Sequence, residues 1–374
     1  MKIYSYLELL KKLSEITEIP GYVKGISSLV ESGIEIPYYI YGNGNNHIIV
    51  VGGIHGNEII TVNVILNIME KAYLIDRNKY TIHFIPVLNP EGYIIATSCI
   101  SKKVNLDDEN ELKKISYDYY LNYKHDCIYD GKIKLHQEMF CDVDYKCIEN
   151  KNLQKMVESI YKNNIFPNGS LIDWRSNGYG LDLNRENEFI DLTCNNITFS
   201  SDNLRCNNIL TNTAGPLGFY RNEVKSSENT FLFNLVCKLY NEKKYAGLLL
   251  YHSTGGCIYY EPDKRCKYYN QYLSFNKKLA NSYRLKTKYI SPNGLIKNGY
   301  KLVLNNGFFS TDEYLRIKFP GVILVELSYM GGNPLGPFGD KENNYIPTIE
   351  NNFIAFMDFI NECKKNKEYM YKLS

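Results

Sequence analysis

The sequence lacks the features that would place this protein in a membrane or on a polyanion. No run in the 374 residues approaches the roughly 20 consecutive apolar side chains that a membrane-spanning helix needs. The formal net charge is only +2, and lysine and arginine are spread among aspartate and glutamate. The sequence therefore predicts no integral membrane segment, and it gives no electrostatic reason to expect nucleic acid as a partner.

Signals for export and for a disulfide framework are also missing. The stretch MKIYSYLELLKKLSEITEIP at the start contains no apolar h-region and no small-residue cleavage site, so we expect a cytoplasmic location or export by another route. In the same stretch, Tyr6, Leu7, Leu10 and Leu13 predict one face of a short helix. The ten cysteines include no CxxC pair, so we expect most of them to be reduced and several to be buried.

Apolar runs that alternate with helical patterns indicate the fold class. Strands are predicted in the stretches NHIIVVGGIHG (46–56), YTIHFIPVLNPEG (80–92), YAGLLLYHSTGG (245–256) and PGVILVELSYMGGNP (320–334). Helical patterns cover residues 229–242, 270–284 and 348–372. This alternation predicts an α/β fold with a mixed, mostly parallel central sheet that is flanked by helices. We expect a single domain over residues 1–374, with an insertion or long excursion at about 100–165.

A histidine and a glutamate follow the first of these strands at a spacing that suits metal binding. His55 and Glu58 stand at positions i and i+3 on a turn into a helix, where both can point into one pocket. An HxxE pair also arises by chance as a polar turn, so a third ligand is needed. His252 follows another apolar run and would project from the same edge of the sheet. The other histidines are interpreted as structural: His47, His83, His125 and His136.

Glu326 and Arg175 are candidates for acid–base chemistry and for binding an oxyanion. Glu326 directly follows an apolar run, which is a costly place for a carboxylate. It is either a structural glutamate paired with an arginine or a general base beside a metal. Arg175, in DWRSNGYGLDLNRE, is either a solvated surface arginine or a group that stabilises an oxyanion. Asn184 and Arg185 of the same stretch can hold a carboxylate.

The order of these motifs resembles that of the M14 zinc carboxypeptidases, the carboxypeptidase A-like metallopeptidases. HxxE, NPEG, GLDLNR, strand-His-Ser and strand-Glu follow one another over nearly the whole chain. The resemblance implies a zinc carboxypeptidase-like fold and one Zn²⁺ per chain, with His55, Glu58 and His252 as its ligands. It implies that Glu326 is the general base and acid and that Arg175 stabilises the oxyanion.

The same resemblance implies a set of substrate-binding residues. Asn184 and Arg185 resemble the pair that receives a substrate carboxylate. Tyr300, in NGYKL, is a candidate for the tyrosine that caps the substrate. Thr311 is expected to line the pocket for the substrate side chain.

Several segments are most similar to the bacterial γ-D-glutamyl-diamino acid peptidases of this family. These segments are HGNE, YHSTGGCIYY and FFSTDEYLRIKFPGVILVELSYMGGNPLG. The expected substrate is therefore a peptide or a muropeptide, cut at a γ-D-glutamyl bond to a diamino acid. An N-acyl amino acid deacylase of the aspartoacylase type is an alternative, because such enzymes share HGNE- and DLNR-like segments. The alternative that is not an enzyme is a metal-containing protein that binds a peptide without hydrolysing it.

Overall fold

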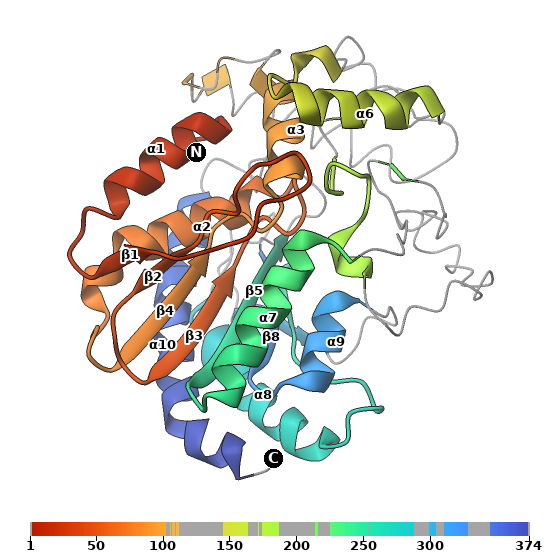
Figure 1. Ribbon diagram of the computed structural model, residues 1–374. Helices are drawn as coiled ribbons and strands as arrows, with labels where there is room; N and C mark the ends of the chain where they lie inside the picture. The colour runs from red at the N-terminus through yellow and green to blue at the C-terminus, as the bar shows by residue number, and fades with distance from the viewer. Residues whose placement is uncertain are drawn as a thin grey trace, which may run out of the picture.

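The computed structural model shows an α/β fold built on one central sheet (Figure 1). It describes residues 2–101, 145–163, 174–186, 225–253, 255–287, 299–303, 310–327 and 345–372, together with residues 105, 107–108, 110–111, 171 and 214–215. Its strands are β1 Tyr22–Lys24, β2 Tyr39–Tyr41, β3 Asn46–Val51, β4 Tyr80–Ile85, β5 Tyr245–Ser253, β6 Cys257–Tyr259, β7 Lys301–Val303 and β8 Val322–Leu327.

Helices precede, connect and follow these strands. The α-helices are α1 Tyr6–Ile16, α2 Ile59–Glu70, α3 Pro90–Ser101, α6 Lys151–Asn163, α7 Ser227–Asn241, α8 Tyr269–Arg284, α9 Thr311–Lys318 and α10 Tyr345–Tyr371. Among the described residues, the short 3-10 helices are η1 Ala72–Leu74, η2 Tyr145–Cys147 and η3 Leu183–Arg185. In the part of the chain that the structure covers, no helix is both long and apolar enough to cross a membrane.

The sheet is mixed, with a parallel centre. Its strand order is β1-β2-β4-β3-β5-β8-β6-β7, and β4, β3, β5 and β8 run parallel to one another. The pairs β1–β2, β2–β4 and β6–β8 are antiparallel. Helix α10 contacts both α2 and α8 on one face, while α7 covers the other face (Figure 1). The expected mixed, mostly parallel sheet with flanking helices is confirmed.

Burial explains why the central strands are nearly continuous apolar runs. In β3 the last four residues are buried, and in β5 eight of nine are buried, as expected for strands with helices on both faces. The register pairs His252 of β5 with Glu326 of β8. The parallel centre therefore brings the carboxyl ends of β3, β5 and β8 to one edge of the sheet.

Two sequence predictions about helices need correction or refinement. The predicted short helix is present as α1, and Leu13 of the expected face is buried in it. The other buried side chains of α1 are Leu9 and Ile16, whereas Leu7 is 72% exposed, so the expected face is wrong at Leu7. The stretch at 80–92, predicted as a strand, is strand only as far as Ile85: Pro90 begins α3, and the Asn89 side chain accepts a hydrogen bond from the Gly92 N–H at 2.8 Å. An asparagine before a first-turn proline is a common helix start.

The expected insertion at about 100–165 is described only in part. Most of residues 102–144 lie outside the described residues, and the single-domain prediction is therefore not tested there. The far end, η2 and α6, lies beside α3 (Figure 1) and forms a second apolar cluster. Leu153 and Val157 of α6 pack in this cluster with Ile95 of α3 and with the buried Trp174.

His83 has the structural role that the sequence predicted. It is 4% exposed and joins a chain of hydrogen bonds, from its Nδ1 to the Tyr38 hydroxyl at 2.6 Å and from its Nε2 to His47 Nδ1 at 2.8 Å. Burial lowers the pKa of His83 to about 3 and that of His47 to about 4. Both imidazoles are therefore neutral donors and acceptors within the sheet near neutral pH.

Replacing His83 with glutamine should reduce the loss of stability in mild acid. In the unfolded chain the imidazole binds a proton near pH 6.5, whereas folded His83 binds one only near pH 3, so each lower pH unit between them favours unfolding by about 1.4 kcal/mol. Urea unfolding of both metal-free proteins at pH 7 and pH 5 measures the effect. The difference in free energy of unfolding between wild type and His83→Gln should be smaller at pH 5 than at pH 7. An unchanged difference would contradict the lowered pKa of His83.

Candidate metal centre and active site

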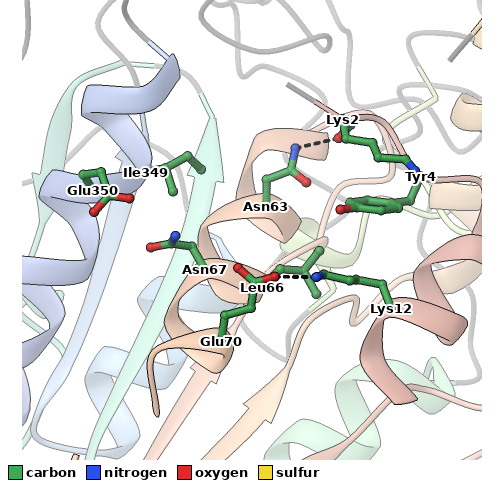
Figure 2. Close-up of a pocket in the computed structure, with 9 residues that line it drawn as sticks. All are labelled: Lys2, Tyr4, Lys12, Asn63, Leu66, Asn67, Glu70, Ile349 and Glu350. Carbon is green, nitrogen blue, oxygen red and sulfur yellow. Dashed lines mark hydrogen bonds and ion pairs between the residues drawn. The ribbon is translucent and has the colours of Figure 1, made fainter. Parts of the chain in front are cut away.

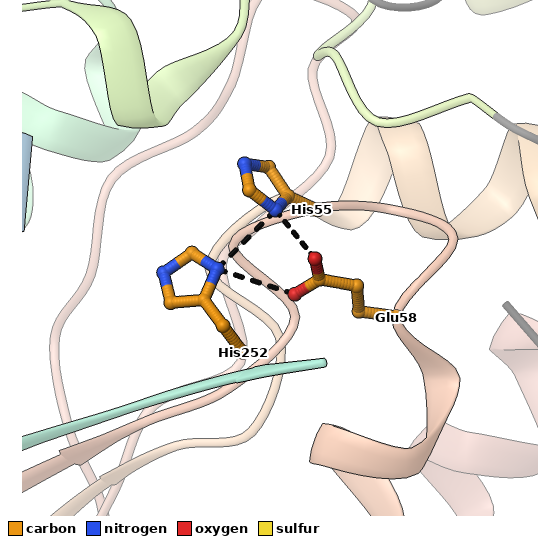
Figure 3. A group of neighbouring side chains, drawn as sticks. All are labelled: His55, Glu58 and His252. Atoms are coloured by element: carbon orange, nitrogen blue, oxygen red, sulfur yellow. Dashed lines mark hydrogen bonds and ion pairs between the residues drawn. The ribbon is translucent and has the colours of Figure 1, made fainter. Parts of the chain in front are cut away.

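Three side chains from distant parts of the sequence converge at the carboxyl edge of the sheet (Figure 3). His55 lies in the turn after β3, Glu58 caps the start of α2, and His252 lies near the end of β5. The His55 Nδ1 is 2.7 Å from Glu58 Oε1, and the His252 Nδ1 is 3.2 Å from both Glu58 Oε2 and His55 Nδ1. The exposed fractions of the three residues are 2%, 7% and 1%.

This donor set fits a zinc ion. Two nitrogens bound to tetrahedral zinc at about 2.0–2.1 Å lie roughly 3.3 Å apart. The observed separation of the two Nδ1 atoms is 3.2 Å. Burial opposes ionisation of Glu58, but the neighbouring imidazoles of His55 and His252 outweigh it and keep the pKa of Glu58 below its usual range. Two imidazoles and an ionised carboxylate are the ligand types of catalytic zinc sites.

Asp182 supports this centre from behind His55. Its carboxylate is fully buried, and its Oδ1 lies 3.1 Å from His55 Nε2 and accepts the Asn184 N–H at 2.8 Å. A carboxylate that accepts the Nε2–H of an imidazole leaves the lone pair on Nδ1, which is the atom that faces Glu58 and His252. Asp182 was not among the site residues predicted from the sequence. Its position as the first residue of DLNR, directly before Leu183 and Asn184, was the signal that could have indicated its role.

Arg175 lies against the same histidine. Its Nη2 is 3.1 Å from His55 Nε2 and 3.6 Å from Asp182 Oδ2. The side chain is 30% exposed, so the guanidinium borders both the buried centre and the solvent. The structure thus brings the predicted oxyanion-binding arginine to the predicted metal ligands.

Glu326 reaches the site from the neighbouring strand. It is paired in register with His252, so both side chains leave the sheet on the same face. Burial raises the pKa of Glu326; the charge of Glu58 adds to this, while His252 and Arg175 oppose it. A carboxylate whose pKa is raised toward neutrality suits proton transfer in both directions.

Asn184, Arg185 and Thr311 are brought together where η3 meets the start of α9. The Asn184 Oδ1 accepts the backbone N–H of Asp312 at 3.2 Å, and Arg185 Nη1 donates to the Asn184 carbonyl at 3.0 Å. The Thr311 hydroxyl lies 2.8 Å from the Leu183 carbonyl. The predicted substrate-binding residues are therefore neighbours, and Thr311 contributes a link between η3 and α9.

The position of Tyr300 argues against its predicted role in capping the substrate. It is 2% exposed and packs in the main core. Its hydroxyl accepts a hydrogen bond from Asn352 Nδ2 at 3.0 Å, and Asn352 also contacts the Tyr283 hydroxyl. A side chain held this way contributes to the core beneath α10, so the substrate-capping residue is left unassigned.

A separate pocket of about 240 Å³ lies between α1, α2 and the start of α10 (Figure 2). Its charges are already paired: Lys12 contacts Glu70 at 2.6 Å, and Glu350 contacts Lys71 at 2.5 Å. The pocket contains none of the predicted site residues. The convergence at the sheet edge is thus the better candidate for chemistry.

Replacing Asp182 with asparagine should weaken zinc binding by about 10- to 100-fold, the usual effect of losing a carboxylate behind a ligating histidine. Competition with a chromogenic chelator measures the affinity. Glu186→Gln is a matched control, because Glu186 is also a buried acid of this segment but contacts Ser226 and Asn229 instead. Equal affinities in the Asp182 variant and wild type would show that His55 does not depend on Asp182.

Comparison with known proteins supports the geometry. The model of the family described as zinc carboxypeptidase, Peptidase_M14, matches residues 32–307, which is more than half of the chain. The match includes His55, Glu58, Arg175 and His252, whereas Glu326 lies beyond its end. No curated protein matches the chain.

Solved carboxypeptidase structures share the fold at low sequence identity. Bovine thrombin-activatable fibrinolysis inhibitor, in complex with tick carboxypeptidase inhibitor, has a TM-score of 0.56 at 14% identity, covering 98% of each chain. Carboxypeptidase A from Helicoverpa armigera has a TM-score of 0.56 at 15% identity, covering 99% of this chain and 75% of the other. The metallo-carboxypeptidase from Burkholderia cenocepacia has a TM-score of 0.51 at 9% identity, covering 96% and 69%.

The family match spans the turn that carries His55 and Glu58 and the strand that carries His252, and the fold places all three in one buried cluster. The chain belongs to the zinc carboxypeptidase family, and it has the fold and the donor set of a metal-dependent peptide hydrolase.

Proposed function

We propose that this protein uses zinc to hydrolyse an amide bond in cell-wall peptides, between a γ-D-glutamyl residue and a diamino acid. The observation that carries the hydrolytic part is the convergence of His55, Glu58 and His252 with Glu326 and Arg175 at one sheet edge. The substrate class is supported by the sequence likeness of HGNE, YHSTGGCIYY and the segment around Glu326 to peptidases of that specificity.

His55, Glu58 and His252 would hold the zinc ion, with Asp182 fixing the tautomer of His55. When bound, zinc supplies a Lewis acid that polarises a carbonyl and acidifies water. The Glu326 carboxylate accepts the proton of the attacking water and returns it to the leaving amine. This cycle requires a group that is ionised before the attack and protonated after it. The raised pKa of Glu326 favours its protonated form, and the positive charge of a bound zinc ion would favour its ionised form.

Arg175 supplies the positive charge for the oxyanion. Its guanidinium lies at the rim of the buried centre and donates to the negative charge that develops on the carbonyl oxygen. Asn184 and Arg185 are proposed to receive a carboxylate on the leaving side, such as that of a diamino acid. Holding that carboxylate fixes which bond of the peptide lies beside Glu326.

The substrate class is tested by mass spectrometry of a muropeptide mixture incubated with the zinc-loaded protein. The expected products are a shortened peptide that ends in the free γ-carboxylate of D-glutamate and a fragment that begins with the free amine of the diamino acid. N-acylaspartate and simple C-terminal peptides belong in the same panel. Cleavage of N-acylaspartate but of no peptide would support a deacylase, and stoichiometric zinc without any turnover would support a binding protein.

Replacing Glu326 with glutamine should lower turnover by roughly 10²- to 10⁴-fold, because the amide cannot accept the proton. Zinc affinity should stay within a few-fold of wild type, since Glu326 is not one of the three donors. Glu313→Gln is a matched control, because Glu313 is a buried glutamate of α9 whose backbone N–H donates to the capping hydroxyl of Ser310. Undiminished hydrolysis by Glu326→Gln would remove the proposed mechanism.

A further inference from the structure

The backbone that carries Arg175 is fastened by two side chains of the NPEG motif, Asn89 and Glu91. Both are fully buried, and neither belongs to the metal-ligand cluster. Residues 174–178 follow one another without regular secondary structure, so no helix or strand ladder fixes their course. The backbone position of Arg175, from which its side chain extends, therefore depends on the hydrogen bonds of this segment to the rest of the protein.

Asn89 binds this segment through its amide nitrogen. Nδ2 lies 3.2 Å from the carbonyl oxygen of Arg175, 3.0 Å from that of Ser176 and 3.3 Å from that of Ile54. An amide nitrogen has only two hydrogens, so it shares them among the three carbonyls. The same group thus connects the arginine segment with the residue before His55.

Glu91 binds the next step of the same segment. Its Oε2 accepts the Gly178 N–H at 2.7 Å, and its Oε1 accepts the Ser32 N–H at 2.8 Å. A Cβ atom on Gly178 would lie 2.6 Å from Glu91 Oε2, so the carboxylate fits directly against the glycine backbone. The segment is therefore held at two points, one on each side of residue 177.

Close backbone packing further restrains the segment that carries Arg175. The Gly56 N–H donates to the Arg175 carbonyl at 3.1 Å. A Cβ on Gly56 would lie 2.1 Å from the Gly92 carbonyl carbon, and a Cβ on Gly92 would lie 2.5 Å from the Ser176 oxygen. The turns of His55, of NPEG and of Arg175 thus meet backbone to backbone.

We propose that Asn89 and Glu91 are positioning residues that set the Arg175 guanidinium against the metal centre. This inference rests on the proposed role of Arg175. The arginine side chain is 30% exposed and therefore only partly enclosed, so the position of its backbone helps to set where the guanidinium lies. Misplacing a reacting group by about 1 Å can cost on the order of 10²-fold in rate, which is why the backbone support matters.

The role in positioning can be separated from the role of Asn89 in starting α3. The Oδ1 of Asn89 accepts the Gly92 N–H at 2.8 Å and caps the helix, while Nδ2 binds the arginine segment. Serine is an equally good helix cap but has no amide nitrogen to bind the carbonyls. Asn89→Ser therefore keeps the helix start and removes only the bridge.

A double-mutant cycle on turnover of the cleaved peptide tests the proposal. Asn89→Ser should lower kcat by about 10- to 100-fold with KM within about three-fold of wild type. In an Arg175→Ala background the same change should lower kcat by less than about three-fold, because the group it positions is gone. An equal loss in both backgrounds would overturn the proposal, since a purely structural role is independent of Arg175.

Two further measurements distinguish this inference from the proposed function. Zinc affinity of Asn89→Ser should stay within about three-fold of wild type; a parallel loss would mean that Asn89 acts through His55, and the proposal fails. If the Arg175→Ala variant hydrolyses the peptide at the wild-type rate, both the proposed role of Arg175 and this inference fail. The proposed role of Glu326 in hydrolysis would not be affected.

Amide hydrogen exchange of the zinc-free proteins requires no activity and tests the bridge itself. The Gly56 N–H, which is bound to the Arg175 carbonyl, should exchange at least ten-fold faster in Asn89→Ser than in wild type. In Glu91→Gln one of the two acceptor oxygens becomes an NH2 donor, so the N–H of either Gly178 or Ser32 should likewise exchange faster. Unchanged exchange at all three amides would overturn the proposal even if no substrate is found.

Discussion

The buried carboxylate of Glu58 is the group on which the rest of the site depends. It is 7% exposed, and an isolated carboxylate in such a place would cost several kcal/mol. Its two oxygens face His55 at 2.7 Å and His252 at 3.2 Å. The two imidazoles are its contacts, and through His55 these contacts extend to Asp182 and Arg175. The site is thus organised outward from one desolvated negative charge.

The sheet supplies the distances that this arrangement needs. Strands β3, β5 and β8 are adjacent and parallel, so the turn with His55, the end of β5 and the end of β8 meet at one edge. The in-register pair His252 and Glu326 places an acid–base candidate one strand away from a metal donor. Loops alone would have to pay a larger entropic cost to hold such groups.

How much of this was visible in the sequence depended on whether a residue had a local signal. His55, His252 and Glu326 each follow an apolar run, and that position predicts the carboxyl edge of a parallel sheet. Asn89 bonds to the carbonyls of Arg175 and Ser176, which lie 86 and 87 positions further along the chain. No local sequence pattern predicts such distant contacts. Tyr300 was a candidate for capping the substrate, but its place in NGYKL cannot show that its hydroxyl turns into the core.

Buried acids around the site show that surroundings, more than residue type, decide a role. Burial works against ionisation of Asp182, but His55 and Arg175 outweigh it and hold its pKa below the usual range, which suits orienting an imidazole. Glu91 accepts two backbone N–H groups, yet burial still raises its pKa. Burial and the nearby Glu91 raise the pKa of Glu228 to about 8, and its Oε1 accepts a hydrogen bond from the Asn177 amide at 3.4 Å. Asp182 is therefore an electrostatic partner of the metal centre, whereas the other two acids act as hydrogen-bonding supports for the segment that carries Arg175.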